Sequence, residues 1–160
     1  MTDSVESSLG VLISVSESLN KASDMLSMRI SEVETALQRY NLGVKAWVEV
    51  YRERHEHEVD GAPHTYVTYL VRLLGYSKNN GKWGLLSAEY WDENEEETWR
   101  QSFLHEAPRD MRIAAIDKLP DLIKKLAHNA TELAAEATTK AETARQIAAT
   151  LVKKSPKSSK

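Results

Sequence analysis

Three histidines that are close in the sequence could bind a transition metal. His55 and His57 stand two residues apart on a predicted strand, so both side chains point to the same face of it. The predicted hairpin places His64 opposite His57, and neutral imidazole nitrogens are common ligands of zinc. Glu53 and Tyr66 could orient these ligands from a second layer. The sequence therefore leaves a metal-dependent enzyme at this hairpin as one hypothesis, beside a solvated hairpin tip whose histidines are only polar.

A second candidate site is a sheet face that mixes aromatic and charged side chains. In the predicted register, Glu49, Arg72 and Glu89 form one row across three strands, with the arginine between two carboxylates. Such a face is typical of a surface that contacts a partner or a ligand. A helix predicted at 109–118, or a second subunit, could instead cover it. The predicted face consists of Trp47, Glu49, Tyr51, Arg72, Tyr76, Trp83, Glu89 and Trp91.

Other catalytic chemistry has little support in the sequence. The chain of 160 residues has no cysteine, which excludes disulfides, thiolate metal ligands and a cysteine nucleophile. The acidic segment 92–97 lacks the glycine of a calcium-binding EF-hand loop, and Phe103 stands where the bidentate glutamate should be. Phosphate-binding glycine loops, dinucleotide fingerprints and serine-hydrolase elbows are absent from the sequence. We therefore expect a non-catalytic protein without a cofactor.

Three antiparallel strands are needed to position these side chains. The segments 44–58, 64–77 and 82–91 are predicted strands with one apolar face. An Asp-Gly and an Asn-Gly dipeptide separate them, and both are strong signals for two-residue hairpin turns. We therefore expect a meander that turns its apolar face toward the core. That face consists of Val44, Ala46, Val48, Val50, Val67, Tyr69, Val71, Leu73, Leu86, Ala88 and Tyr90.

The segment before the strands, residues 3–40, is predicted to be one long helix. Asp3 can cap it, with Glu6 three residues later as in a capping box. Apolar residues recur at alternating steps of three and four, which is the seam of a coiled coil, although Ser16 and Ser23 occupy two seam positions. Because its many serines make this helix weak on its own, we expect it to need a partner helix.

The segment after the strands supplies a candidate partner. Pro108 opens a short predicted helix that ends near Lys118, and Pro120 starts a second helix that continues to about Val152. The second helix repeats the seam spacing, broken once by Lys140. Residues 108–160, tail included, carry a net charge of +5 and residues 1–42 carry −3, which favours antiparallel pairing of the two long helices. Since two helices bury little surface, we expect the pair to form a homodimer.

Together these patterns predict an α+β protein with its helices in a coiled-coil-like antiparallel bundle. The segments are 1–42 (long helix), 43–107 (three-stranded antiparallel sheet with the acidic loop) and 108–152 (kinked C-terminal helices), followed by a basic tail at 153–160 that we expect to be disordered. No stretch is apolar enough to span a membrane. An acidic protein without a basic patch rich in aromatics is a poor nucleic-acid binder.

The function that the sequence favours is a protein-interaction or adaptor module that self-associates through its helices and presents the sheet face to another protein. The acidic N-terminal residues, which lack the basic start of a signal peptide, indicate a cytoplasmic location. The alternative is a small-molecule ligand-binding or sensor module, with the ligand between the sheet face and the Pro108 crossover or at the dimer interface. Trp47, Trp83, Trp91 and Arg72 would then line the site.

Overall fold

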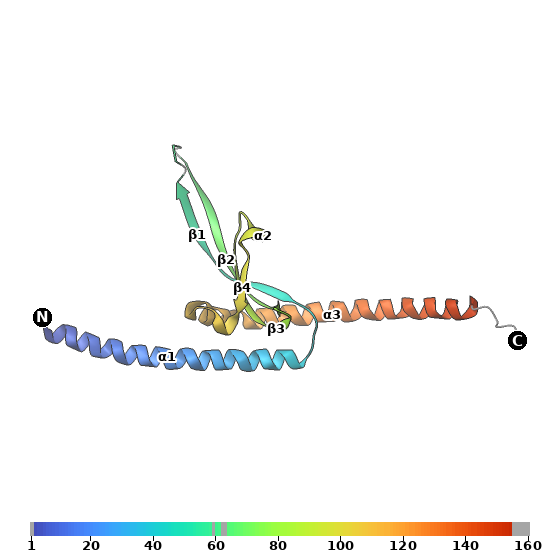
Figure 1. Ribbon diagram of the computed structural model, residues 1–160, viewed down its shortest axis with the longest axis horizontal. Coiled ribbons are helices and arrows are strands. Elements are labelled where there is room, and N and C mark those ends of the chain that lie inside the picture. The colour runs from blue at the N-terminus through green and yellow to red at the C-terminus, as the bar shows by residue number, and fades with distance from the viewer. Residues whose placement is uncertain (1, 59, 62–63, 155–160) are drawn as a thin grey trace.

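A small antiparallel sheet stands on two long helices, α1 (Thr2–Arg39) and α3 (Arg109–Lys154), as Figure 1 shows. The computed structural model describes residues 2–58, 60–61 and 64–154, so positions 155–160 of the predicted basic tail lie outside the described residues. A short helix, α2 (Glu95–Thr98), and a 3-10 turn, η1 (Leu104–Glu106), lie between the sheet and α3. The α+β composition that the sequence predicts is confirmed.

The sheet has four strands in the order β1-β2-β3-β4, one more than the sequence predicts. All neighbours are antiparallel, and the strands are β1 (Ala46–Glu58), β2 (Thr65–Asn79), β3 (Lys82–Trp91) and β4 (Arg100–Phe103). Between β2 and β3, Asn80 and Gly81 have positive φ angles of 49° and 80°, as the predicted two-residue turn requires. The outer halves of β1 and β2 extend beyond the other strands as a two-stranded arm that projects from the body (Figure 1).

A bulge in β1 changes which residues share a face of the sheet. The pairing with β2 shifts between Glu49 and Tyr51, so that Tyr51 and not Glu49 lies opposite Arg72. On the other side Glu89 lies opposite Arg72, as the sequence predicts. The predicted row of three is therefore wrong at Glu49, because one extra residue moves all later side chains of the strand to the other face.

The two helices cover the sheet face that was predicted to be open. Leu74, Tyr76 and Leu85 are buried in the core cluster between the sheet and the helices. Val71 and Leu86, which were predicted to face that core, are buried on the opposite side of the sheet. The assignment is wrong for β2 and β3 because both faces of these strands are rich in apolar residues, so alternation does not identify the inner one.

The two long helices run in the same direction and are offset along their length (Figure 1). At the start of α3, Arg109 donates a 2.9 Å hydrogen bond to Asn20 of α1, and Arg112 donates a 2.7 Å bond to Ser23 Oγ. The C-terminal half of α1 therefore lies beside the N-terminal half of α3, and the predicted antiparallel pairing is wrong. The free ends of the helices project in opposite directions (Figure 1).

The helix α3 is continuous where two helices were predicted. Pro120 lies inside it and has no N–H to donate to the carbonyl one turn earlier. Leu119 and Leu122 on either side are buried in the core, 9% and 0% exposed. Packing of these side chains offsets the lost backbone hydrogen bond, so proline does not start a new helix here.

Side chains of both helices bind the open edges of the sheet. Side chains of α1 form hydrogen bonds with the part of the β3 edge that β4 is too short to reach, and side chains of α3 form hydrogen bonds at the outer edge of β1. These contacts fix the position of the sheet on the two helices. The four bonds run from the Leu85 N–H to Glu34 Oε2 (2.7 Å), from Gln38 Nε2 to the Trp83 carbonyl (2.7 Å), from Lys125 Nζ to the Trp47 carbonyl (2.8 Å) and from Asn129 Nδ2 to the Lys45 carbonyl (2.9 Å).

Candidate functional site

Arg72 lies on the helix-facing side of the sheet and is held loosely by two carboxylates. Its Nε lies 3.7 Å from Glu53 Oε1, and its Nη1 lies 3.6 Å from Glu89 Oε2. The Tyr51 ring faces the guanidinium, with 5.6 Å from Cζ to the ring centre. Both carboxylate distances are longer than a hydrogen bond, and the buried Nε has no hydrogen-bond partner among the described residues. The guanidinium is therefore oriented but still has donors to offer.

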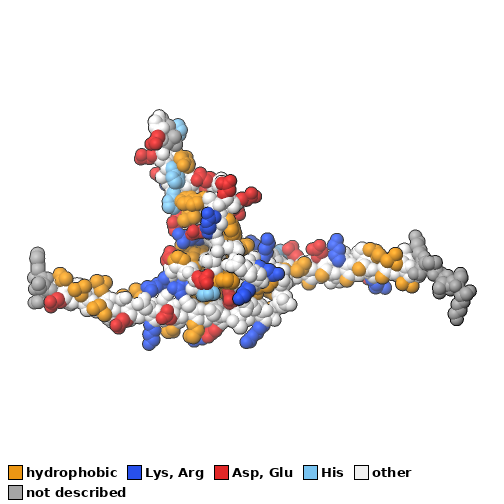
Figure 2. Space-filling view, viewed as in Figure 1, with side chains coloured by type: hydrophobic (Ala, Val, Ile, Leu, Met, Phe, Trp, Pro, Cys, Tyr) orange, Lys and Arg blue, Asp and Glu red, His pale blue; other side chains and the backbone are white. Residues whose placement is uncertain are grey.

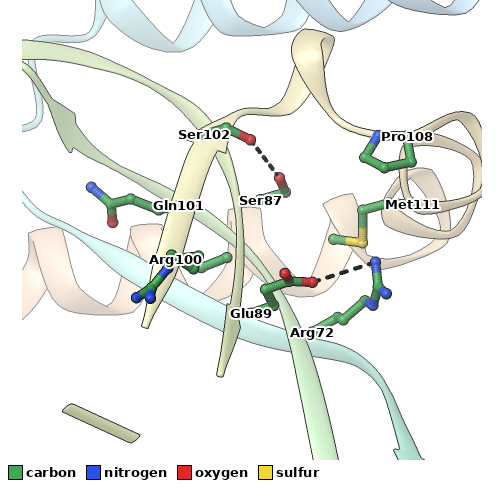
Figure 3. A pocket seen from close by; sticks show the side chains of 9 residues that line it. Arg72, Ser87, Glu89, Arg100, Gln101, Ser102, Pro108 and Met111 are labelled. Atoms are coloured by element: carbon green, nitrogen blue, oxygen red, sulfur yellow. Dashed lines mark hydrogen bonds and ion pairs between the residues drawn. The ribbon is translucent and has the colours of Figure 1, made fainter. Parts of the chain in front are cut away.

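A cavity of about 190 Å³ lies beside Arg72, where the sheet meets the start of α3 (Figure 3). Ser87 and Ser102 line its sheet side, with their hydroxyl oxygens 3.3 Å apart. Pro108 and Met111 form an apolar wall. The cavity occupies the place that the sequence predicts for a ligand, between the sheet face and the Pro108 crossover. Of the four residues predicted to line that site, Arg72 does so, whereas Trp47, Trp83 and Trp91 are not part of the lining.

Trp47 and Glu49 lie on the outer face of the sheet, away from the helices. The Trp47 ring meets Trp99 edge-on at 5.2 Å, and Trp99 stacks on Tyr90 at 5.8 Å. Glu49 accepts two hydrogen bonds from Arg52, at 2.8 and 2.6 Å, which lower the pKa of its carboxyl group. Trp99 directly precedes strand β4, which the sequence does not predict.

Tyr76 and Trp83 form a stacked pair that belongs to the core. Their ring centres are 5.4 Å apart, and both rings pack in or against the core cluster under the helices. Tyr76 is 2% exposed, and this burial raises the pKa of its hydroxyl group. Lys78 Nζ lies 5.5 Å from the centre of the Trp83 ring. The pair therefore packs the sheet against α1 and does not form an open contact surface.

The predicted metal-binding histidines lie on and beside the projecting arm. His57 pairs with Tyr66, and not with His64, and the two rings stack at 4.8 Å. His55 packs against Trp91, also at 4.8 Å, while His64 is exposed before β2 begins. Within the part of the chain that the structure describes, no group of three or more His, Cys, Asp or Glu side chains is placed to hold a metal ion. The predicted opposition of His57 and His64 is wrong, and the three imidazoles do not converge.

The projecting end of α1 carries apolar side chains that no described residue covers (Figure 2). Ile30 and Leu37 occupy seam positions near the sheet and are 1% and 8% exposed. Leu12 and Leu19 occupy the same seam nearer the N-terminus, yet they are 62% and 45% exposed. The seam is thus continuous along the helix and packed over only half of its length. The other exposed apolar residues of this end are Val5, Leu9, Val11, Ile13 and Val15.

The projecting end of α3 shows the same change from packed to open. Leu122 and Leu126 are buried, whereas Leu133, Ile147 and Leu151 are 44%, 57% and 65% exposed. The two projecting ends, residues 4–22 of α1 and 131–153 of α3, are called the helix ends below. Sequence reasoning identified both seams, but it did not show that each is only half covered.

Comparisons of the chain with protein-family models, with curated proteins and with solved structures gave no match. No helix in the described part of the chain has a stretch that is both long and apolar enough to cross a membrane.

Proposed function

We propose that the protein is a non-catalytic, cytoplasmic interaction module that self-associates by pairing its helix ends with those of a second copy. The observation that carries this proposal is the continuity of the seams. The residues that pack α1 and α3 onto the core repeat with the same spacing into the helix ends, where their side chains are exposed. Exposed apolar surface of this extent on a folded protein marks an interaction site.

The composition of the α1 end supports the need for a partner. Residues 4–22 contain six serines, a glycine and several β-branched residues, all of which are weaker helix formers than alanine or leucine. In proteins, most of the stability of a helix comes from packing of its apolar face and not from helix propensity. Its helical state is therefore stabilised when the apolar face is packed against another chain.

The α3 end has the composition of a suitable partner. It contains seven alanines, the strongest helix former, beside seven β-branched residues, and the small alanine side chains let a neighbouring helix approach closely. Each copy carries one end of each kind, and the two project in opposite directions (Figure 1). A two-fold axis across the helices would lay each α1 end along the α3 end of the other copy. This arrangement covers all four helix ends and leaves none free to bind a third copy, so the dimer has the closed symmetry of most homo-oligomers.

The proposal is tested by replacing Leu12 and Leu19 with glutamine. Glutamine has a helix propensity close to that of leucine, so the change removes apolar contact without weakening the helix. Burial of one leucine stabilises by about 1.5–3 kcal/mol, so we expect the double variant to weaken the dimer at least ~100-fold. Multi-angle light scattering over a dilution series measures this change.

The matched control is Ser14→Gln with Lys21→Gln, which lies on the other side of the same helix and should leave the dimer unchanged. The pairing of α1 with α3 also requires that Ile147→Gln with Leu151→Gln weaken the dimer by a similar factor. An α3 variant that dimerises like the unmodified chain would show that the α1 ends pair with each other instead.

A further inference from the structure

The cavity beside Arg72 is separate from the helix ends. It lies between β3, β4 and the start of α3. Figure 3 shows Arg72 and Glu89 on one side of it, with Ser87 and Ser102 on the other. Met111 projects between them from the first turn of α3. Polar groups therefore face one another across a gap with an apolar wall.

Hydrogen-bond donors in this cavity are not fully used. The guanidinium of Arg72 is 3.6–3.7 Å from its two carboxylates, which is beyond hydrogen-bond distance, while its Nε is buried beside Glu53. The 3.3 Å separation of the Ser87 and Ser102 oxygens exceeds the usual 2.7–2.8 Å of a hydroxyl pair, so this bond is weak. An arginine with two nearby hydroxyl groups is a suitable donor set for a planar oxyanion such as a carboxylate.

The charge and the size of the cavity restrict the ligand further. Two arginines, Arg72 and Arg100, and one carboxylate, Glu89, line it, and a second carboxylate, Glu53, lies 3.7 Å from Arg72 outside the lining. A singly charged anion can pair with the arginines, whereas a second negative charge on the ligand would be repelled by these two carboxylates. The volume of about 190 Å³ is below the ~300–1,000 Å³ of pockets that hold drug-sized molecules, so a smaller ligand suits this cavity.

We propose that this cavity binds a short-chain aliphatic monocarboxylate. The carboxylate accepts hydrogen bonds from Arg72 and from the serine hydroxyls, and the aliphatic part contacts Pro108 and Met111. Glu89 stays beside the guanidinium and limits the site to single negative charge. Neither this site nor its test depends on the state of association of the chain.

Propionate is the probe for this proposal, and the side-chain Nε–H signal of Arg72 in a nitrogen–proton correlation spectrum is the readout. We expect a saturable shift with half-saturation near ~1 mM, which is usual for a ligand of this size. Arg72→Lys keeps the charge but loses the planar donor pair, so propionate binding, followed on the Met111 methyl signal, should weaken at least ~10-fold. The matched control is Arg54→Lys, since Arg54 lies on the exposed part of β1 and pairs with Glu56.

Two comparison ligands test whether the site requires a singly charged carboxylate. Propionamide has the same shape as propionate without the charge, and inorganic phosphate carries more charge near neutral pH; neither should bind measurably. Phosphate that binds as tightly as propionate would overturn the assignment to a monocarboxylate. The proposal of a carboxylate site is overturned if propionate gives no saturable shift up to about 100 mM, or if Arg72→Lys leaves its affinity unchanged.

Discussion

The side chain of Trp47 requires a glycine at position 75. An ideal Cβ built on Gly75 would collide with the six-membered part of the Trp47 ring, which lies flat against the β2 backbone. We expect Gly75→Ala to lower the free energy of unfolding by about 1–3 kcal/mol, the usual cost of forcing an extra methyl group into packed surroundings. Urea denaturation followed by tryptophan fluorescence measures it.

The matched control is the same change at Gly10. No atom lies within 4 Å of a Cβ there, and the residue is inside α1. Alanine should therefore be neutral or stabilising by up to about 1 kcal/mol. Equal destabilisation by both changes would mean that contact with Trp47 is not the cause.

Arg72 and Glu89 were paired correctly from the sequence because the Asn-Gly turn between their strands sets the register of β2 and β3 directly. Glu49 was misplaced because nothing in the sequence marks the bulge that follows it. The same bulge brings Tyr51 and Glu53 to Arg72. The cavity lies between the sheet and Pro108, which is one of the two places that the sequence left open for a ligand, but Ser102 could not be assigned to it without β4.

At the scale of elements, helix side chains replace a strand at the edge of the sheet. Glu34 accepts the N–H of Leu85, which would otherwise be a partly buried donor without a partner. We expect Glu34→Ala to lower the free energy of unfolding by about 1–3 kcal/mol, the cost of leaving such a donor unpaired. Amide exchange at Leu85 should accelerate as well.

Glu32→Ala is the control for this prediction, since Glu32 lies on the same helix in an exposed ion pair with Arg29. Pairs of this kind contribute about 0–1 kcal/mol. If Glu34→Ala were as mild as Glu32→Ala, with exchange at Leu85 unchanged, α1 would not be the partner of the β3 edge.

Strand β4 is the element that the sequence could not reveal. Its four residues have no clear alternation, and it forms a strand because the edge of β3 offers free backbone groups. β4 determines where α3 begins. Because it runs antiparallel to β3, it brings the chain back to the end of the sheet that lies on the helices, where Arg109 at the start of α3 contacts Asn20 of α1. With three strands, the chain would leave the sheet at its opposite end.

At the scale of the whole molecule, the predicted seams agree with the burial of Ile30, Leu37 and Leu126, whereas the predicted direction of the helices is wrong. The spacing of apolar residues depends only on the local sequence, whereas the direction depends on the number of strands between the helices. Net charge misled the prediction, because four of the eleven basic residues counted in residues 108–160 belong to the tail at 153–160, which contains no acidic residue. Parallel, offset helices explain why one half of each seam is packed and the other half is exposed.

Sedimentation velocity of the unmodified chain, from about 1 to 100 µM, tests the central claim most directly. Pairing of the helix ends predicts a reversible change from one chain to two as concentration rises, with no larger species. A single chain at every concentration would contradict self-association. A continuing series of larger assemblies would contradict closure by a two-fold axis, because it would mean that the helix ends pair head to tail.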